Sequence, residues 1–130
     1  TYAYTRDGSP LKVQVPATPG SYELRYVAST VGRKVISKVP LEVTPVEATI
    51  DVEATAAPAG VLEVNWTGPG YPNDYISISK AGDKGYISYV YAREGSPVLL
   101  KVPDIQGEYD VRYVMGQGRT VLTSSPVKVE

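Results

Sequence analysis

Two stretches of this 130-residue chain are closely similar: YAYTRDGSPLKVQVPATPGSYELRYV at residues 2–27 and YVYAREGSPVLLKVPDIQGEYDVRYV at residues 89–114. At a constant offset of 87 residues, half of the aligned positions are identical. After a one-residue deletion the match continues from Gly32 with Gly118 to Val43 with Val129. Because self-similarity at a fixed period indicates repeated structural units, we expect one unit of about 86 residues and part of another.

The strand pattern predicts an all-β fold. Hydrophobic residues make up 42% of the chain and charged residues 21%, which favours a packed core. The 12 glycines and 11 prolines are spread along the chain, as they are between many short strands. Alternation and turn signals predict strands at 48–54, 61–67, 74–80, 85–93, 97–102, 107–116 and 119–129. Seven such strands are typical of an immunoglobulin-like antiparallel β-sandwich, with a β-barrel as the alternative.

The repeat predicts two tandem copies, of which the first is truncated at its N-terminus. Residues 45–130 form the complete copy of about seven strands, and residues 1–44 form a partial copy with the four C-terminal strands. Four strands cannot cover both faces of their own core. We therefore expect a protein partner or the neighbouring repeat to cover the partial copy, and a homodimer by strand exchange or sheet-edge pairing is one form of this.

Local signals refine this prediction. Tyr109 follows Gly107 near the start of a predicted strand, and Tyr22 stands at the same place in the partial copy. This pattern is typical of a tyrosine corner, in which the hydroxyl bonds to the backbone a few residues upstream. The pairs Asp7-Gly8 and Glu94-Gly95 predict tight hairpin turns, because such pairs accept positive φ angles.

Composition excludes several function classes. The net charge is −1 without a basic run, so we expect no nucleic-acid partner. No apolar stretch reaches 18 residues, so we expect no membrane span. The chain lacks Cys and His, which removes the commonest nucleophile–base pairs and transition-metal ligands. We therefore expect no enzyme activity, no catalytic residues, no cofactor and no metal.

The loop at residues 67–74 is a candidate binding loop, because loops at the ends of a sandwich often contact partners. Its candidate residues are Tyr71, Asn73 and Asp74. The alternative is that Gly and Pro form an ordinary turn that Asp74 caps.

Tyrosines provide a second candidate surface. Tyr89 and Tyr91 are two residues apart and share one strand face, as do Tyr2 and Tyr4 in the partial copy. Together with Arg112 they form a candidate aromatic and arginine surface that suits a sugar or a peptide. The alternative is packing of the rings in or beside the core.

Charged side chains complete the candidates. Arg25 and Arg112 hold the same position in the two copies, and a cross-strand partner is the alternative to a ligand role. The acidic residues Asp51, Glu53 and Glu63 lack the ligand spacing of a calcium loop, so we interpret them as a solvated sheet face.

The segment WTGPGYPNDYISI at 66–78, followed by YVYAREGSP, GEYDVRYV and a final SPVKV, resembles a repeat of large bacterial extracytoplasmic proteins. In those proteins immunoglobulin-like repeats accompany a von Willebrand factor A domain. The resemblance covers most of residues 61–130 and the matching part of 1–44. The metal site of an A domain has the pattern DxSxS, whereas Asp74, Ser77 and Ser79 are spaced differently, so that domain and its metal are not carried over.

The resemblance implies a non-catalytic structural or protein-interaction module of a larger exported bacterial protein, in the periplasm, secreted or at the cell surface. Two alternatives stay open. One is a carbohydrate-binding module that uses exposed tyrosines, and the other is an accessory domain of a larger enzyme.

Overall fold

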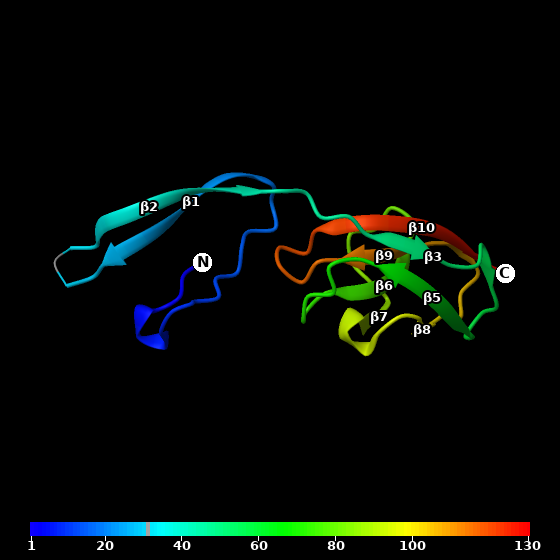
Figure 1. The fold of residues 1–130 in the computed structure, drawn as a ribbon. Helices are drawn as coiled ribbons and strands as arrows, with labels where there is room; N and C mark the ends of the chain where they lie inside the picture. The colour runs from blue at the N-terminus through cyan, green and yellow to red at the C-terminus, as the bar shows by residue number, and fades with distance from the viewer. Residues whose placement is uncertain (31) are drawn as a thin grey trace. The chain divides into compact units, whose positions relative to one another are not determined.

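The computed structural model describes residues 1–30 and 32–130, and their regular structure is almost entirely β-strand (Figure 1). The all-β fold class is therefore confirmed. The chain divides into two compact units, Thr1–Pro45 and Val46–Glu130. Within the described residues, no helix is long and apolar enough to span a membrane.

The second unit contains two sheets. The smaller sheet has the strand order β3 (Thr49–Asp51), β5 (Val61–Thr67), β8 (Val98–Lys101). The larger sheet has the order β4 (Thr55–Ala56), β10 (Val121–Val129), β9 (Gly107–Val114), β6 (Tyr75–Lys80), β7 (Ser88–Tyr91). Neighbouring strands pair antiparallel, except that β4 runs parallel to β10.

Strand alternation builds the core of the second unit. Val64 and Leu100 on the smaller sheet are fully buried, as are Ile76, Val111 and Tyr113 on the larger sheet. Removing an aliphatic side chain of this size from water stabilises the fold by about 1.5–3 kcal/mol relative to exposure. Polar and charged residues at the intervening positions, such as those of β5, face solvent. This period of two is the pattern that predicted the strands.

The first unit is an antiparallel hairpin of β1 (Gly20–Ala28) and β2 (Lys34–Val43), preceded by the 3-10 turn η1 (Thr5–Asp7). The prediction of four strands in residues 1–44 is wrong, because the described residues of this unit form only these two. The counterparts of the two missing strands are β7 and β8, which pair with β6 and β5 in the second unit. Residues 1–45 hold no counterpart of β6 or β5.

Two predicted strands of the second unit differ from those observed. Within the segment 48–54 only β3 is a strand, and β4 follows at Thr55–Ala56 and joins the other sheet. The segment 85–93 is a strand only over β7 and then enters the 3-10 turn η2 (Ala92–Glu94). Because β7 and β8 belong to different sheets, Glu94-Gly95 is not a hairpin turn, although Gly95 does have a positive φ of 97°. Asp7-Gly8 behaves in the same way, with φ of 92° at Gly8 after η1.

The predicted tyrosine-corner hydrogen bonds are present in both units. The Tyr109 hydroxyl donates to the Ile105 carbonyl oxygen at 2.7 Å, and the Tyr22 hydroxyl donates to that of Thr18, also at 2.7 Å. Each tyrosine therefore ties the start of its strand to the loop before it.

Core packing predicts unequal effects for two adjacent leucines of β8. Leu100 is fully buried, whereas Leu99 is 64% exposed. We expect Leu100→Ala to lower the free energy of unfolding of the second unit by about 2–5 kcal/mol, because it leaves a cavity. Leu99→Ala should change it by less than about 0.5 kcal/mol. Urea unfolding followed by the fluorescence of Trp66, the single tryptophan, measures both variants, and equal losses would contradict this core.

Candidate functional site

The loop between β5 and β6 is held from inside by Asp74, which is only 1% exposed. One carboxylate oxygen of Asp74 accepts from the Tyr113 hydroxyl at 2.7 Å and from the Tyr71 backbone N–H at 3.1 Å. The other accepts from the Gly116 backbone N–H at 3.0 Å. A buried carboxylate requires such donors, because desolvation without partners is costly. Asp74 thereby connects its own loop, strand β9 and the turn after β9.

Tyr113 continues this network toward the loop. Its hydroxyl accepts from the backbone N–H of Gly70 at 2.8 Å while it donates to Asp74. Burial, followed by the hydrogen bond to Asp74, raises the pKa of the Tyr113 hydroxyl well above its ordinary value of about 10. A Cβ at Gly68 would lie 2.8 Å from the Tyr113 ring, which explains why the loop needs glycine there.

These contacts revise the candidate binding loop. Asp74 is inward-facing and fully hydrogen-bonded, so it positions the loop and is not part of its exposed surface. Tyr71 is 43% exposed and Asn73 is exposed. The alternative in which Asp74 caps the turn therefore describes its geometry, and Tyr71 and Asn73 are the residues that the loop presents to solvent.

Four tyrosines form one cluster, which we call the tyrosine cluster: Tyr75 on β6, Tyr89 and Tyr91 on β7, and Tyr86 in the segment between these strands. Successive ring centroids lie 4.9–5.9 Å apart, and their planes cross at 64–83°. Edge-to-face pairs of this kind contribute about 0.5–1.5 kcal/mol each beyond the burial of their area. Burial raises the pKa of the Tyr75 hydroxyl above its ordinary value. The rings therefore make a corrugated surface and not a flat strip.

Arginines border the tyrosine cluster. The Arg93 guanidinium lies 4.1 Å from the centre of the Tyr91 ring and donates to the Pro72 carbonyl oxygen at 3.2 Å. It thus joins the cluster to the loop that carries Tyr71. Arg112 lies across Ser77 from Tyr89 in the sheet register, but its side chain is mostly covered and pairs with Asp110 of the same strand at 3.4 Å.

The predicted surface of Tyr89, Tyr91 and Arg112 is thus partly assembled. The two rings are in contact, with centroids 5.3 Å apart. Sequence reasoning missed Tyr75 and Arg93 as neighbours. Two sequence features could have indicated them. Tyr75 lies next to Ile76 in a strand and therefore faces outward, and Arg93 recurs as Arg6 in the repeat.

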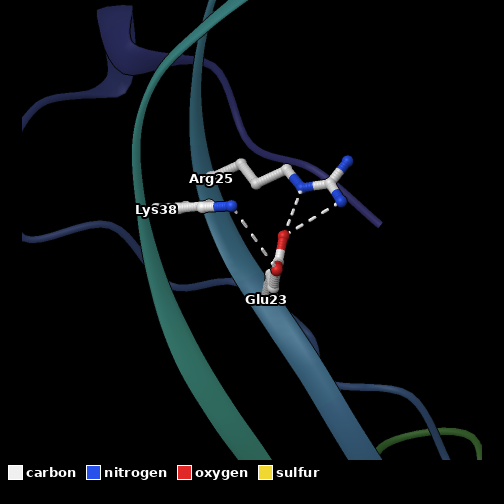
Figure 2. A network of polar contacts seen from close by, with 3 residues as sticks. All are labelled: Glu23, Arg25 and Lys38. Atoms are coloured by element: carbon white, nitrogen blue, oxygen red, sulfur yellow. Dashed lines mark hydrogen bonds and ion pairs between the residues drawn. The ribbon is translucent and has the colours of Figure 1, made fainter.

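The first unit repeats part of this arrangement. Tyr2 and Tyr4 meet edge to face at 5.4 Å, and Arg6 lies 4.2 Å from the Tyr4 ring centre. Figure 2 shows the outer face of the hairpin, where Glu23 lies between Arg25 at 3.0 Å and Lys38 at 4.0 Å. These ion pairs are exposed and contribute at most about 1 kcal/mol each.

The inner face of this hairpin is the largest difference between the units. We call it the open face, and it consists of Tyr22, Leu24, Tyr26, Val39 and Leu41, which the register places on one side. Leu24 is 50% exposed and Tyr26 is 49% exposed. Their repeat counterparts, Val111 and Tyr113, are fully buried. Corresponding side chains of the repeat are therefore buried in the second unit and exposed in the first.

Asp51, Glu53 and Glu63 border one open depression beside β5. Among residues 1–30 and 32–130, no group of three or more His, Cys, Asp or Glu side chains is placed to hold a metal ion.

Comparison of the chain with protein-family models found no match, and neither did a search of curated proteins.

The Asp74–Tyr113 hydrogen bond predicts a stability loss for Tyr113→Phe. The variant leaves a buried carboxylate oxygen short of a donor, so we expect the free energy of unfolding of the second unit to fall by about 1–3 kcal/mol at pH 7. Tyr86→Phe, in which the ring is half exposed, is the control and should change it by less than about 0.5 kcal/mol. Urea unfolding followed by Trp66 fluorescence compares the variants.

The raised pKa of Tyr113 predicts a pH dependence of that loss. Below the unfolded pKa of about 10, both states hold the proton and the hydroxyl contributes its full stability. Above it the unfolded tyrosine releases its proton while the folded one keeps it, so stability falls as pH rises. The difference between wild type and Tyr113→Phe should therefore shrink between pH 9 and pH 11 (roughly the range set by that pKa). A difference that stays constant over this range would contradict the assignment.

Proposed function

We propose that the chain is a non-catalytic structural or protein-interaction module of a larger exported bacterial protein, built from two tandem immunoglobulin-like repeats. The observation that carries the proposal is the open face of the first unit. A contiguous group of exposed apolar side chains is typical of a site of protein contact. Export rests on the resemblance of residues 61–130 to repeats of bacterial extracytoplasmic proteins.

Backbone irregularities support the tandem copies. One residue is left out of the ladder register in each hairpin, Ile36 in β2 and Leu122 in β10, and these positions correspond in the repeat. The corner hydrogen bonds of Tyr22 and Tyr109 also correspond. Bulges and corners of this kind are local features of sequence, so their recurrence favours one repeat used twice.

Strand order supports the immunoglobulin-like fold. The order β3-β5-β8 agrees with strands A, B and E of such a sandwich, and the order β10-β9-β6 agrees with strands G, F and C, which supports the proposal. The corner tyrosine opens β9, which is the position of strand F. One departure is Trp66, which lies on β5, whereas the usual core tryptophan lies on strand C.

A carbohydrate-binding module is the second candidate, and the exposure of Tyr71, Tyr86 and Tyr89 favours it. A sugar ring stacks best on a flat aromatic surface. The edge-to-face geometry of the tyrosine cluster therefore supports a protein contact more than a sugar contact. The third alternative, an accessory domain of a larger enzyme, has no such observation in its favour.

A comparison of dye binding and solution mass tests the proposed function. We expect an apolar fluorescent dye to bind the chain, or the chain to self-associate with concentration, because the open face is accessible. Leu24→Ser combined with Leu41→Ser should remove most of this signal. Leu99→Ser is the control, because Leu99 is a still more exposed leucine, at 64% against 50% for Leu24, but lies on the second unit.

Two results would contradict the proposal. Dye binding that persists in the double variant would place the contact surface elsewhere. Binding of a glycan that depends on Tyr89, measured on a glycan array, would favour the carbohydrate module instead.

A further inference from the structure

A short acceptor motif for glycans attached to asparagine lies on strand β5. Asn65-Trp66-Thr67 has the pattern N-x-T, in which the middle residue is not proline. The one other asparagine of the chain, Asn73, is not followed by serine or threonine two positions later. Glu63 stands two residues before Asn65. An acidic side chain, an amide and a hydroxyl therefore follow one another at every second position.

Strand alternation brings these three side chains to one exposed face of the smaller sheet. Glu63, Asn65 and Thr67 are exposed, whereas the alternating Leu62 and Val64 are buried. Residues two apart on a strand point to the same side of a sheet. The motif therefore faces solvent, and the core does not depend on its side chains.

The surroundings of Asn65 leave room for a bulky group. Asn65 is paired with Asp51 of β3, and both residues border an open depression of about 770 Å³. On the other side of β5, Leu99 stands opposite Glu63 and is 64% exposed. A glycan is bulky and hydrophilic and requires a surface position. A glycan on Asn65 would therefore extend into solvent over this sheet.

We propose that Asn65 is the acceptor of an N-linked glycan. The inference rests on the export that is part of the proposed function, because this modification is made on exported proteins. The Asn65 side-chain Nδ2 attacks the anomeric carbon of an oligosaccharide that a lipid diphosphate carries. The new N–C bond forms as the bond from that carbon to the diphosphate oxygen breaks. The amide nitrogen gives one proton to a base of the transferase, and the lipid diphosphate leaves.

The folded sheet sets the order of modification and folding. β5 is paired with β3 at Asn65, and the backbone N–H of Trp66 donates to the Ser96 hydroxyl at 3.1 Å. The Thr67 and Thr49 hydroxyls are hydrogen-bonded to each other at 2.6 Å. A transferase has to hold the acceptor backbone and the Thr67 hydroxyl itself, so it needs β5 outside the sheet. The glycan is therefore attached before the second unit folds and stays on its outer face afterwards.

The intact mass of the exported chain tests the acceptor site. The full chain with an export signal is produced in a bacterium that carries a lipid-linked oligosaccharide and an asparagine oligosaccharyltransferase, beside an exported control protein that this enzyme modifies. The transferase chosen is one that requires an acidic residue two positions before the asparagine. We expect one added glycan, which peptide mapping by mass spectrometry places on Asn65, and none on Asn73.

Variants of the motif provide matched controls. Thr67→Ser keeps the hydroxyl and should still be modified, whereas Thr67→Val keeps the branched shape without the hydroxyl and should carry no glycan. Asn65→Gln and Glu63→Gln should also carry none. All four positions of change are exposed, so these variants should fold like the wild type, which urea unfolding checks.

Two leucines of β8 test the order of events. The folded, unmodified chain is incubated with the purified transferase and its lipid-linked donor. We expect Leu100→Ala to be modified about tenfold faster than the wild type or more, because loss of a buried leucine raises the unfolded fraction by such a factor. Leu99→Ala, at an exposed position, should react at the wild-type rate. Equal rates for Leu100→Ala and the wild type would contradict the order.

Failure of this inference and failure of the proposed function give different results. If the exported wild-type chain carries no glycan while the control protein does, or if Thr67→Val is still modified, the acceptor site is wrong and the interaction module stands. If dye binding persists in the Leu24→Ser and Leu41→Ser double variant, the contact surface is wrong and the acceptor site stands. Fractionation that finds the protein in the cytoplasm of its native host would overturn both.

Discussion

In the second unit, the 2.7 Å hydrogen bond between the Tyr113 hydroxyl and the buried Asp74 carboxylate joins the loop between β5 and β6 to strand β9. Asp74 stands where the loop from β5 enters β6, and Tyr113 stands near the end of β9, the strand that β6 pairs with. The same carboxylate holds the turn after β9 through Gly116. A buried charge is tolerated only with all its donors in place, so this bond requires β5, β6 and β9 to come together in one arrangement.

The first unit contains a counterpart of the tyrosine in that interaction. Tyr26 stands at the position of Tyr113, next to Leu24 in the place of Val111, yet both are half exposed. A two-stranded hairpin has no second layer with which to bury its apolar face, and such a hairpin alone is marginally stable in water. The charged outer face, with Glu23 between two cations, keeps that side in solvent. The apolar face of β1 is therefore exposed where that of β9 is buried.

Much of this fold can be predicted from sequence, because its strands alternate regularly. The segment 61–67 became β5 without change, and the corner bond of Tyr109 is local, spanning four residues. The fate of Asp74 was not predictable, since its partner Tyr113 is 39 residues away and a turn cap has the same local signature. The prediction of strands before β1 was wrong for a related reason. Alternation shows which side chains share a face, but a strand also needs a neighbouring strand for its backbone hydrogen bonds.

Hydrogen exchange at matched amides of the two units most directly tests whether the same strand is covered in one unit and uncovered in the other. In the full chain without any added partner, we expect the amides of Tyr109–Val114 to exchange only through global unfolding of their unit, because they are paired on both edges. The matched amides of Tyr22–Val27 should exchange orders of magnitude faster, through local opening. Equal protection of the two strands in a chain that sediments as a monomer would contradict the account.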